Sequence, residues 1–242
     1  MKKFILLLII SITIMPVTAN TLYDSATNTP IGNAKVTIPK YNYSTYTDSN
    51  GNFDLGNIKD TTIMSVQKDG YRPFSLTVNN DTIASKPLVV GIQKSDISDI
   101  VIESGMMHLG DDNYSSSSAN AGYFRLPSAG PSFSKSFKMN SATGNNYLVI
   151  GSIVGIDTLM ARSMGQNNIV NSYASPPEVY FNGVKISEIQ LNGDNQKIKL
   201  PNNLIRPNLQ NQVTIRTGRN LMQRAYVDYD DIEIANLSVI SD

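Results

Sequence analysis

The sequence contains no cysteine, no tryptophan and a single histidine, His108. Without cysteine the chain can form neither a disulfide nor a thiolate metal site, and cysteine-based catalysis is excluded. One histidine excludes metal sites that need two, and a serine-histidine-acid triad would have to use His108 itself. Glycine motifs that hold phosphates or dinucleotides are also missing. The common sequence signals of enzymes are therefore scarce, and no catalytic residue is predicted.

The chain also lacks an excess of charge of one sign, because 20 Lys and Arg balance 20 Asp and Glu. No basic stripe is present, so we do not expect nucleic acid as a partner. The one long apolar run covers residues 4–10, follows two lysines and precedes a small-residue cleavage site at Val17 and Ala19. We expect residues 1–19 to be a signal peptide and the protein to be secreted or periplasmic after cleavage. No later run is long enough for a membrane span.

Residues 20–93 consist of short apolar alternations separated by turn residues, such as "AKVTI", "GNFDLGNI" and "FSLTV". This spacing predicts a small antiparallel β-sandwich. The turn at 48–51, "DSNG", has side chains that can bond their own backbone, and Gly51 can adopt a positive φ without strain.

Three segments in this region resemble successive pieces of the carboxypeptidase regulatory-like domain, which is a transthyretin-like sandwich of seven strands. They are "YDSATNTPIGNAKVTI", "TYTDSNGNFDLGNI" and "MSVQKDGY". The resemblance implies a structural or interaction role in a secreted or surface protein, and it implies no catalytic residues.

A polar segment at residues 94–99, "KSDISD", is predicted to be a linker, and residues 100–242 again show a β pattern with longer loops. Asn182-Gly183 lies between two alternating runs and is the strongest short signal for a β-hairpin. The fold class is therefore predicted as all-β, with a small seven-stranded sandwich followed by a second, larger sandwich.

Four segments of the second unit resemble the galactose-binding-like jelly roll that occurs in many carbohydrate-binding modules. They are "MHLGDDNYS", "VYFNGVKI", "NQVTIRTG" and "DYDDIEIANLSV". In that architecture the first and last strands lie side by side, which would bring "LGDDN" close to "YDDIE". Many modules of this kind carry a structural calcium near the junction of those strands, so the resemblance implies a calcium there.

An acidic cluster would form if these two segments meet, because Asp111, Asp112, Asp230 and Asp231 would crowd together, with Glu103 or Glu233 nearby. Like charges so close repel unless a cation neutralises them. Calcium binds about six to eight oxygen ligands, and carboxylates, Asn113 and loop carbonyls can supply them. We therefore predict structural Ca²⁺ held by the four aspartates. Two alternatives remain: the acids solubilise an exposed strand edge, or a pair of them catalyses glycoside hydrolysis.

Candidate ligand-binding residues lie in the loops, which commonly carry function on a sandwich. Sugars are gripped by aromatic faces and planar polar groups, and the loops offer Tyr173, Arg219, Arg224 and Tyr226. We expect a secreted, non-enzymatic protein whose second sandwich recognises a glycan. A structural or adhesive protein that binds other cell-surface proteins is one alternative, and a role within a secreted hydrolase system or as a carboxylate-dependent glycoside hydrolase is another.

Overall fold

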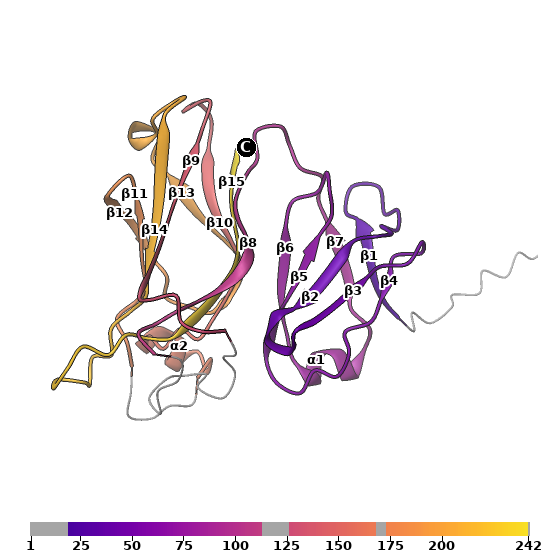
Figure 1. Cartoon of the computed structure of the whole chain (residues 1–242), viewed down its shortest axis with the longest axis horizontal. Helices are drawn as coiled ribbons and strands as arrows, with labels where there is room; N and C mark the ends of the chain where they lie inside the picture. The colour runs from indigo at the N-terminus through magenta and orange to yellow at the C-terminus, as the bar shows by residue number, and fades with distance from the viewer. Residues whose placement is uncertain (1–18, 113–125, 168–172, 242) are drawn as a thin grey trace, which may run out of the picture.

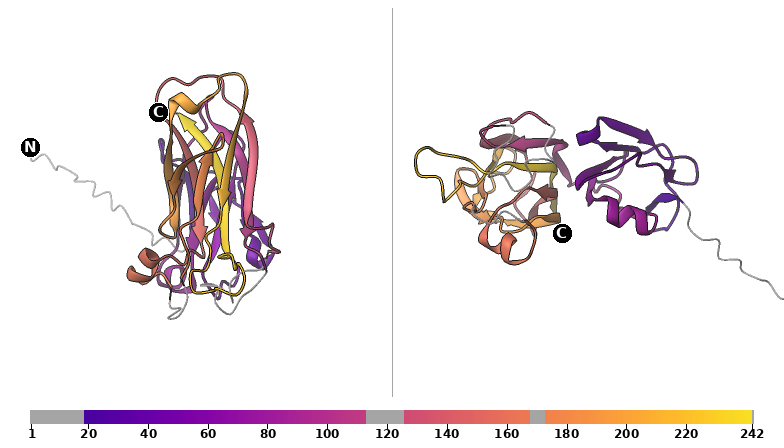
Figure 2. Two further views of the ribbon diagram at one scale, coloured as in Figure 1. Left: turned by 90° about the vertical axis from the view of Figure 1, so that its left-hand side faces the viewer. Right: turned by 90° about the horizontal axis from the view of Figure 1, so that it is seen from below.

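The computed structural model describes residues 19–112, 126–167 and 173–241, and the signal-peptide prediction falls almost wholly outside them. Two β-sandwiches lie side by side, as Figure 1 and the view from below in Figure 2 show. Almost all regular structure is β, which confirms the predicted all-β class. Within the described ranges, no helix has the length and apolar character needed to cross a membrane.

The first sandwich packs a three-stranded sheet, ordered β4-β1-β7, against a four-stranded sheet, ordered β3-β2-β5-β6. In the smaller sheet β1 runs antiparallel to β4 and parallel to β7, whereas all pairs in the larger sheet are antiparallel. The elements are β1 (Asn20–Asp24), β2 (Lys35–Ile38), η1 (Pro39–Tyr41), β3 (Tyr43–Tyr46), β4 (Asn52–Phe53), β5 (Thr62–Gln67), β6 (Phe74–Val78), α1 (Asn80–Ser85) and β7 (Val89–Ile92).

The core of this sandwich consists of the inward residues of the alternating strands, among them Leu22, Val36 and Met64, which are fully buried. The turn before β4 forms as predicted. The carboxylate of Asp48 accepts hydrogen bonds from the backbone N–H groups of Asn50 and Asn52 at 2.9 and 2.8 Å. These bonds replace the backbone partners that a strand would supply and so fix the turn.

The second sandwich packs two four-stranded sheets, ordered β13-β10-β15-β8 and β12-β11-β14-β9, and every strand pair is antiparallel. The elements are β8 (Ile100–Leu109), β9 (Ser132–Lys138), β10 (Asn146–Val154), α2 (Leu159–Ser163), β11 (Glu178–Phe181), β12 (Val184–Glu188), β13 (Gly193–Leu200), η2 (Asn202–Leu204), β14 (Gln210–Arg216) and β15 (Ile232–Ser241).

Its core lies between the two sheets and includes the fully buried side chains of Leu148, Phe181 and Ile234. The predicted hairpin is present, because Asn182 and Gly183 join β11 to β12 with φ angles of 50° and 84°. Two successive positive φ angles are what a tight hairpin turn needs.

The two sandwiches contact each other through β6, which lies against β10, β13 and β15 of the second unit. The first sandwich thus covers the face of the sheet β13-β10-β15-β8 that points away from the second core (Figure 1). Asp194 accepts hydrogen bonds from the backbone and hydroxyl of Thr77, and the amide nitrogen of Asn236 donates to Ser65 at 3.3 Å. Polar groups therefore join the two units across a direct interface.

Candidate functional site

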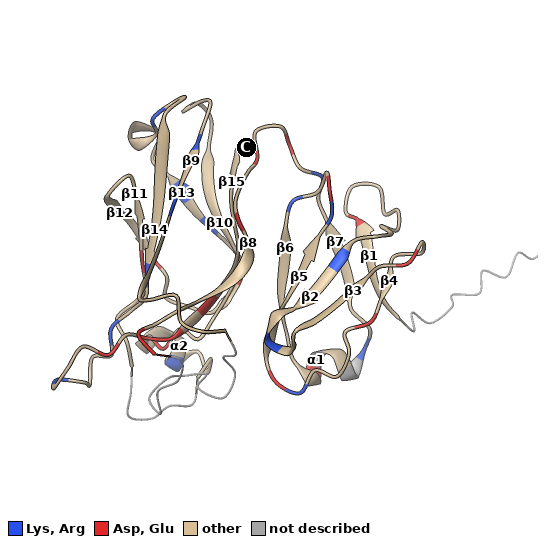
Figure 3. Cartoon of the chain, viewed as in Figure 1, with Lys and Arg blue, Asp and Glu red and all other residues tan. Residues whose placement is uncertain are grey.

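The acidic segments meet at one end of the second sandwich, where β8 ends and β15 begins. The two strands pair antiparallel with Leu109 opposite Ile232, so the residues that follow β8 lie beside those that precede β15. Figure 3 shows acidic residues gathered at this end. The predicted adjacency of "LGDDN" and "YDDIE" is confirmed for the part of these segments that the structure describes.

Asp231 and His108 form a buried pair at this end, each 1% exposed. Nε2 of His108 lies 3.0 Å from Oδ1 of Asp231, and Nδ1 lies 2.9 Å from the carbonyl oxygen of Leu126. Burial opposes the charged imidazolium, but the bonds to these two acceptors favour it, and the net effect raises the pKa of His108. A doubly protonated ring can donate to both acceptors, so His108 acts here as a structural donor.

Asp230 is also buried, and its Oδ2 accepts a hydrogen bond from the backbone N–H of Asp157 at 3.1 Å. Burial raises the pKa of Asp230 well above its ordinary value, and the charges of Asp157, Asp231 and Asp228 raise it further. Asp111 is exposed, as is Asp112. Partial desolvation still raises the pKa of Asp111. Neighbouring carboxylates thus add to the effect of burial on the pKa of both Asp230 and Asp111, as crowding of these acids implies.

Two of the four predicted metal ligands are thus buried and two are exposed. Carboxylate oxygens suit Ca²⁺, and Oδ2 of buried Asp231 has no hydrogen-bond partner in the described part of the chain. Yet no group of three or more His, Cys, Asp or Glu side chains among the described residues is arranged to hold a metal ion. Asn113 lies outside the described residues. The calcium site stays a prediction.

The strand-edge interpretation of the acids does not fit Asp230 and Asp231. β15 lies between β10 and β8 in its sheet, so it has no exposed edge, and Asp230 and Asp231 are buried. For Asp111 and Asp112, which are exposed just after the edge strand β8, the interpretation stays a prediction. Glu233 is buried opposite His108. Glu103 lies in the middle of β8, away from the cluster, and pairs with Lys135 at 3.2 Å.

Three of the four predicted ligand residues lie on the loop between β14 and β15, and hydrogen bonds hold the base of this loop. Asn220 donates from its backbone to the carbonyl of Asp228 at 2.8 Å and from its side chain to the carboxylate of Asp228 at 2.9 Å. Gly218 accepts from the backbone of Asp230 at 2.9 Å. The backbone of Leu221 donates to the carbonyl of Tyr173 at 2.9 Å, which brings the fourth residue alongside.

The tip of this loop points away from the body of the sandwich (Figure 1), and most of the side chains at the tip are exposed. Tyr226 is 64% exposed, and Arg219 and Arg224 are exposed as well. Tyr173 is half-buried, and the guanidinium carbon of Arg162 lies 5.8 Å from its ring centre. The structure therefore brings the four predicted ligand residues to one end, which we call the loop end and define as Tyr173, Arg219, Arg224 and Tyr226.

Apolar side chains that sequence reasoning did not select also lie at this end. The loop exposes Leu221, Met222 and Val227, and α2 exposes Leu159 and Met160. α2 adjoins the loop because Arg162 contacts Tyr173, which in turn bonds Leu221. The sequence signal was the run "NLMQRAYV", in which apolar residues occur inside a loop rather than a strand.

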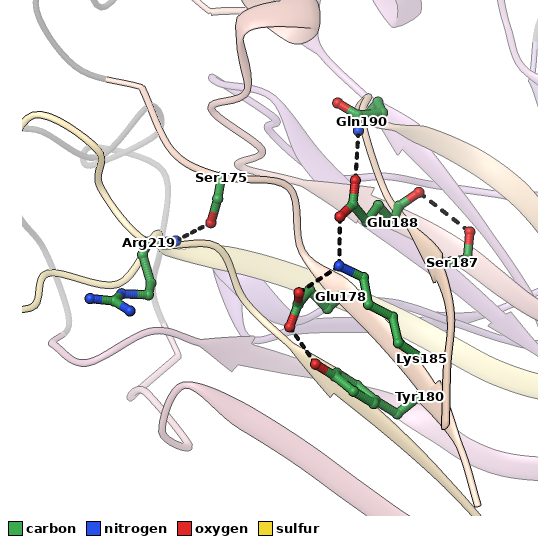
Figure 4. Close-up of polar contacts among 8 residues, drawn as sticks. All are labelled: Ser175, Glu178, Tyr180, Lys185, Ser187, Glu188, Gln190 and Arg219. Carbon is green, nitrogen blue, oxygen red and sulfur yellow. Dashed lines mark hydrogen bonds and ion pairs between the residues drawn. The ribbon is translucent and has the colours of Figure 1, made fainter. Parts of the chain in front are cut away.

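A polar network on the neighbouring hairpin was likewise not predicted (Figure 4). The ammonium of Lys185 lies 2.7 Å from Glu178 and 2.6 Å from Glu188, and the hydroxyl of Tyr180 donates to Glu178 at 2.6 Å. Ser175, which lies three positions before Glu178 in the chain, accepts a hydrogen bond from the backbone of Arg219 at 3.0 Å. The groups of the network bond mainly one another, so the network holds the outer face of the sheet in shape.

Comparison with known proteins informs the first sandwich. No curated protein matches the chain. The resemblance of the second sandwich to the galactose-binding-like jelly roll stays a prediction. Residues 21–102 match the CarboxypepD_reg-like domain family, as the sequence motifs predicted, and the first sandwich is a CarboxypepD_reg-like domain.

Proposed function

We propose that this protein is a non-enzymatic binding protein, exported from the cell, whose second sandwich recognises an extracellular or cell-envelope glycan through the loop end. The first sandwich would serve as a spacer or docking unit. The second would be a galactose-binding-like jelly roll, an assignment that the pairing of its first and last strands supports.

The observation that supports this proposal best is the construction of the loop between β14 and β15. Backbone hydrogen bonds fix its base, while its tip exposes the ring of Tyr226 and the guanidinium of Arg224. A loop that is ordered before it binds loses less conformational entropy on binding. An exposed aromatic ring and a planar donor group suit a sugar ligand, because the ring packs against C–H groups of the sugar and the guanidinium donates hydrogen bonds to its hydroxyls.

A role in binding rather than hydrolysis is supported by the state of the titratable groups. A general acid or base must reach the atom whose proton it moves. His108 and Asp231 are each 1% exposed and bond each other, and Asp230 is bonded to the backbone of Asp157. These groups stabilise the end of the sandwich in a position where a substrate does not reach them.

A protein partner is the second candidate, and the exposed apolar residues favour it. Leu221 and Met222 are 50% and 55% exposed, and Leu159 on α2 is 62% exposed. A contiguous apolar surface on a soluble protein commonly marks a protein interface. Such a partner would bury the apolar tip, whereas a glycan would contact mainly Tyr226 and the arginines.

A glycan array with the full exported chain tests the proposal, with Tyr226→Ala and Arg224→Ala as variants. Tyr46 is 59% exposed on the first sandwich, so Tyr46→Ala is the matched control for the loss of a surface tyrosine. We expect binding that both loop variants weaken and the control retains. A folded protein that binds no glycan would contradict the proposal. Binding to a partner protein that the Leu221→Ser variant loses would favour the second candidate.

A further inference from the structure

A cavity of about 260 Å³ lies between the two sandwiches, and none of its lining residues belongs to the loop between β14 and β15. The first sandwich contributes residues of β6 and β7 and the segments next to them. The second contributes β10, β13 and β15. Pockets that bind drug-sized ligands have volumes of about 300–1,000 Å³. This smaller cavity therefore suits a smaller molecule, of about the size of one sugar unit. Domain interfaces are a common place for such sites.

The charge of the lining is unbalanced, although the chain as a whole is neutral. Arg72 and Lys197 line the cavity. Among the described residues, no Asp or Glu lines it. The guanidinium of Arg72 is held by Asp99, with Nε 2.6 Å from Oδ2. Lys197 is exposed on β13 of the opposite sandwich, and its ammonium nitrogen lies 5.9 Å from the ring centre of Tyr147. Asp99 binds the guanidinium of Arg72 through both carboxylate oxygens and compensates its charge, so the ammonium of Lys197 is the group that makes the site complementary to an anion.

Neutral polar groups and an apolar wall complete the lining. The amides of Gln93 and Asn195 and the hydroxyl of Ser238 are hydrogen-bonding groups, whereas Phe74 and Val149 are apolar. Oε1 of Gln93 accepts from Nη1 of Arg72 at 3.0 Å, which orients the amide and leaves its nitrogen as a donor. Amides and hydroxyls complement ligand hydroxyls, and the apolar wall complements a face of C–H groups.

Each sandwich contributes one buried polar atom without a described hydrogen-bond partner to residues that line the cavity. Ser75 and Asn236 line the cavity and are each 3% exposed. Oγ of Ser75 and Oδ1 of Asn236 have no hydrogen-bond partner within the described residues. Buried polar atoms are normally bonded, so the interface has unused hydrogen-bonding capacity at this point.

We infer that this interdomain cavity is a second binding site, distinct from the loop end, and that it takes a small hydroxylated carboxylate such as a uronic acid unit. The ligand carboxylate lies against Lys197, with Arg72 on the opposite wall. Its hydroxyls bond the amides of Gln93 and Asn195 and the hydroxyl of Ser238. The C–H face of the ring packs on Phe74 and Val149.

Calorimetric titration of the full chain with glucuronate and galacturonate tests this inference, with glucose as the uncharged probe. The central variant is Lys197→Met. Lys199 lies two residues along the same strand, is also exposed and does not line the cavity, so Lys199→Met is the matched control. We expect Lys197→Met to weaken uronate binding about tenfold or more, because an ionic hydrogen bond is lost. Lys199→Met should bind like the wild type.

A second variant, Ser238→Phe, fills the cavity from β15 and should also abolish binding while Tyr226→Ala retains it. Weakening by Tyr226→Ala but not by Lys197→Met would assign the uronate to the loop end and overturn the inference. Glucose binding as tight as glucuronate binding would overturn the ligand class. Absence of uronate binding to the folded wild type would overturn the site itself, whatever the glycan array shows for the loop end. Titration with oligogalacturonate then distinguishes a free acid from a polymer end.

Discussion

The carboxylate of Asp194 joins the two sandwiches by accepting hydrogen bonds from Thr77. The backbone nitrogen of Thr77 lies 3.0 Å from Oδ1 and 3.1 Å from Oδ2, and its hydroxyl lies 2.9 Å from Oδ1. The hydroxyl of Ser152, within the second sandwich, donates to the same oxygen at 2.6 Å. One side chain thus bonds β6 of the first unit and β10 of the second. Both strands contribute residues to the interdomain cavity.

Replacement of Asp194 by alanine should loosen this junction. Thr77 and the buried Ser152 would both lose their acceptor, and a hydrogen bond to a charged group contributes about 1.5–3 kcal/mol. We expect a lower melting temperature and faster proteolysis within residues 94–99. Asp69 is exposed in the turn between β5 and β6, so Asp69→Ala is the control. Equal melting and cleavage for the two variants would contradict a role for Asp194 at the junction.

The stability of the first sandwich should fall in acid because of Asp24. Its Oδ1 accepts from the backbone of Ala26 at 2.9 Å and of Thr27 at 3.1 Å, and the hydroxyl of Tyr71 donates to Oδ2 at 3.0 Å. The bond from Ala26 is the main cause that lowers the pKa of Asp24 below its ordinary value of 3.8. Its contribution is therefore present above the unfolded pKa and is lost as the pH falls through the folded pKa.

Urea denaturation at neutral pH and at pH values below 3.8 measures this contribution. Asn at position 24 can still accept the backbone bonds but does not titrate, so Asp24→Asn should lose less stability than the wild type between the two conditions. Parallel losses in the two proteins would assign the acid sensitivity to other carboxylates. Asp48→Asn is a useful comparison, since bonds from Asn52 lower the pKa of that carboxyl in the same direction.

Gly110 should not tolerate a side chain, because the Cβ of an alanine would collide with Oδ1 of Asp231. Asp231 would have to leave His108, and overpacking of a buried site costs about 1–3 kcal/mol. We expect Gly110→Ala to destabilise the second sandwich in urea denaturation. Gly105 lies on β8, which ends just before Gly110, and an added Cβ at Gly105 meets only the flexible side-chain end of Glu103 at 3.2 Å. An effect of Gly105→Ala as large as that of Gly110→Ala would contradict this explanation.

Local signals predicted much of the fold. Asn182-Gly183 predicted a hairpin because two residues determine the geometry of the turn, and the "DSNG" turn at 48–51 bonds its own backbone in the same local way. The family motifs identified the first sandwich because they place several strands in order. These features depend on neighbours in the sequence, so one sequence suffices to predict them.

The junction and the burial of the acids depend on distant contacts and could not be predicted. Thr77 and Asp194 are 117 positions apart, and neither lies in a motif. The sequence leaves Asp231 as a metal ligand, a solvated residue or a catalytic acid, yet it is buried because β15 lies inside its sheet and His108 faces it from β8. The sequence placed Asp231 beside β8 correctly, but the strand order that buries it is a property of the whole sandwich.

Calcium should stabilise the second sandwich if the acidic cluster binds it. Burial and the nearby charges raise the pKa of Asp230, so a cation at this end would relieve repulsion that the folded chain otherwise bears. If calcium binds the folded state alone, a free calcium concentration of one hundred times Kd raises the free energy of unfolding by about 2.7 kcal/mol. We expect a higher melting temperature of the full chain in millimolar calcium than in chelator.

The exposed pair Asp111 and Asp112 provides a sharper variant than Asp231, because replacing Asp231 also disturbs the buried bond to His108. Asp111→Asn with Asp112→Asn should abolish the calcium-dependent rise and leave the melting temperature in chelator close to that of the wild type. Asp69→Asn, an exposed acid of the first sandwich, should keep the rise. A wild-type protein that melts at the same temperature in both buffers would refute the metal site. Repulsion among the buried carboxylates would then be an intrinsic cost of this end of the sandwich.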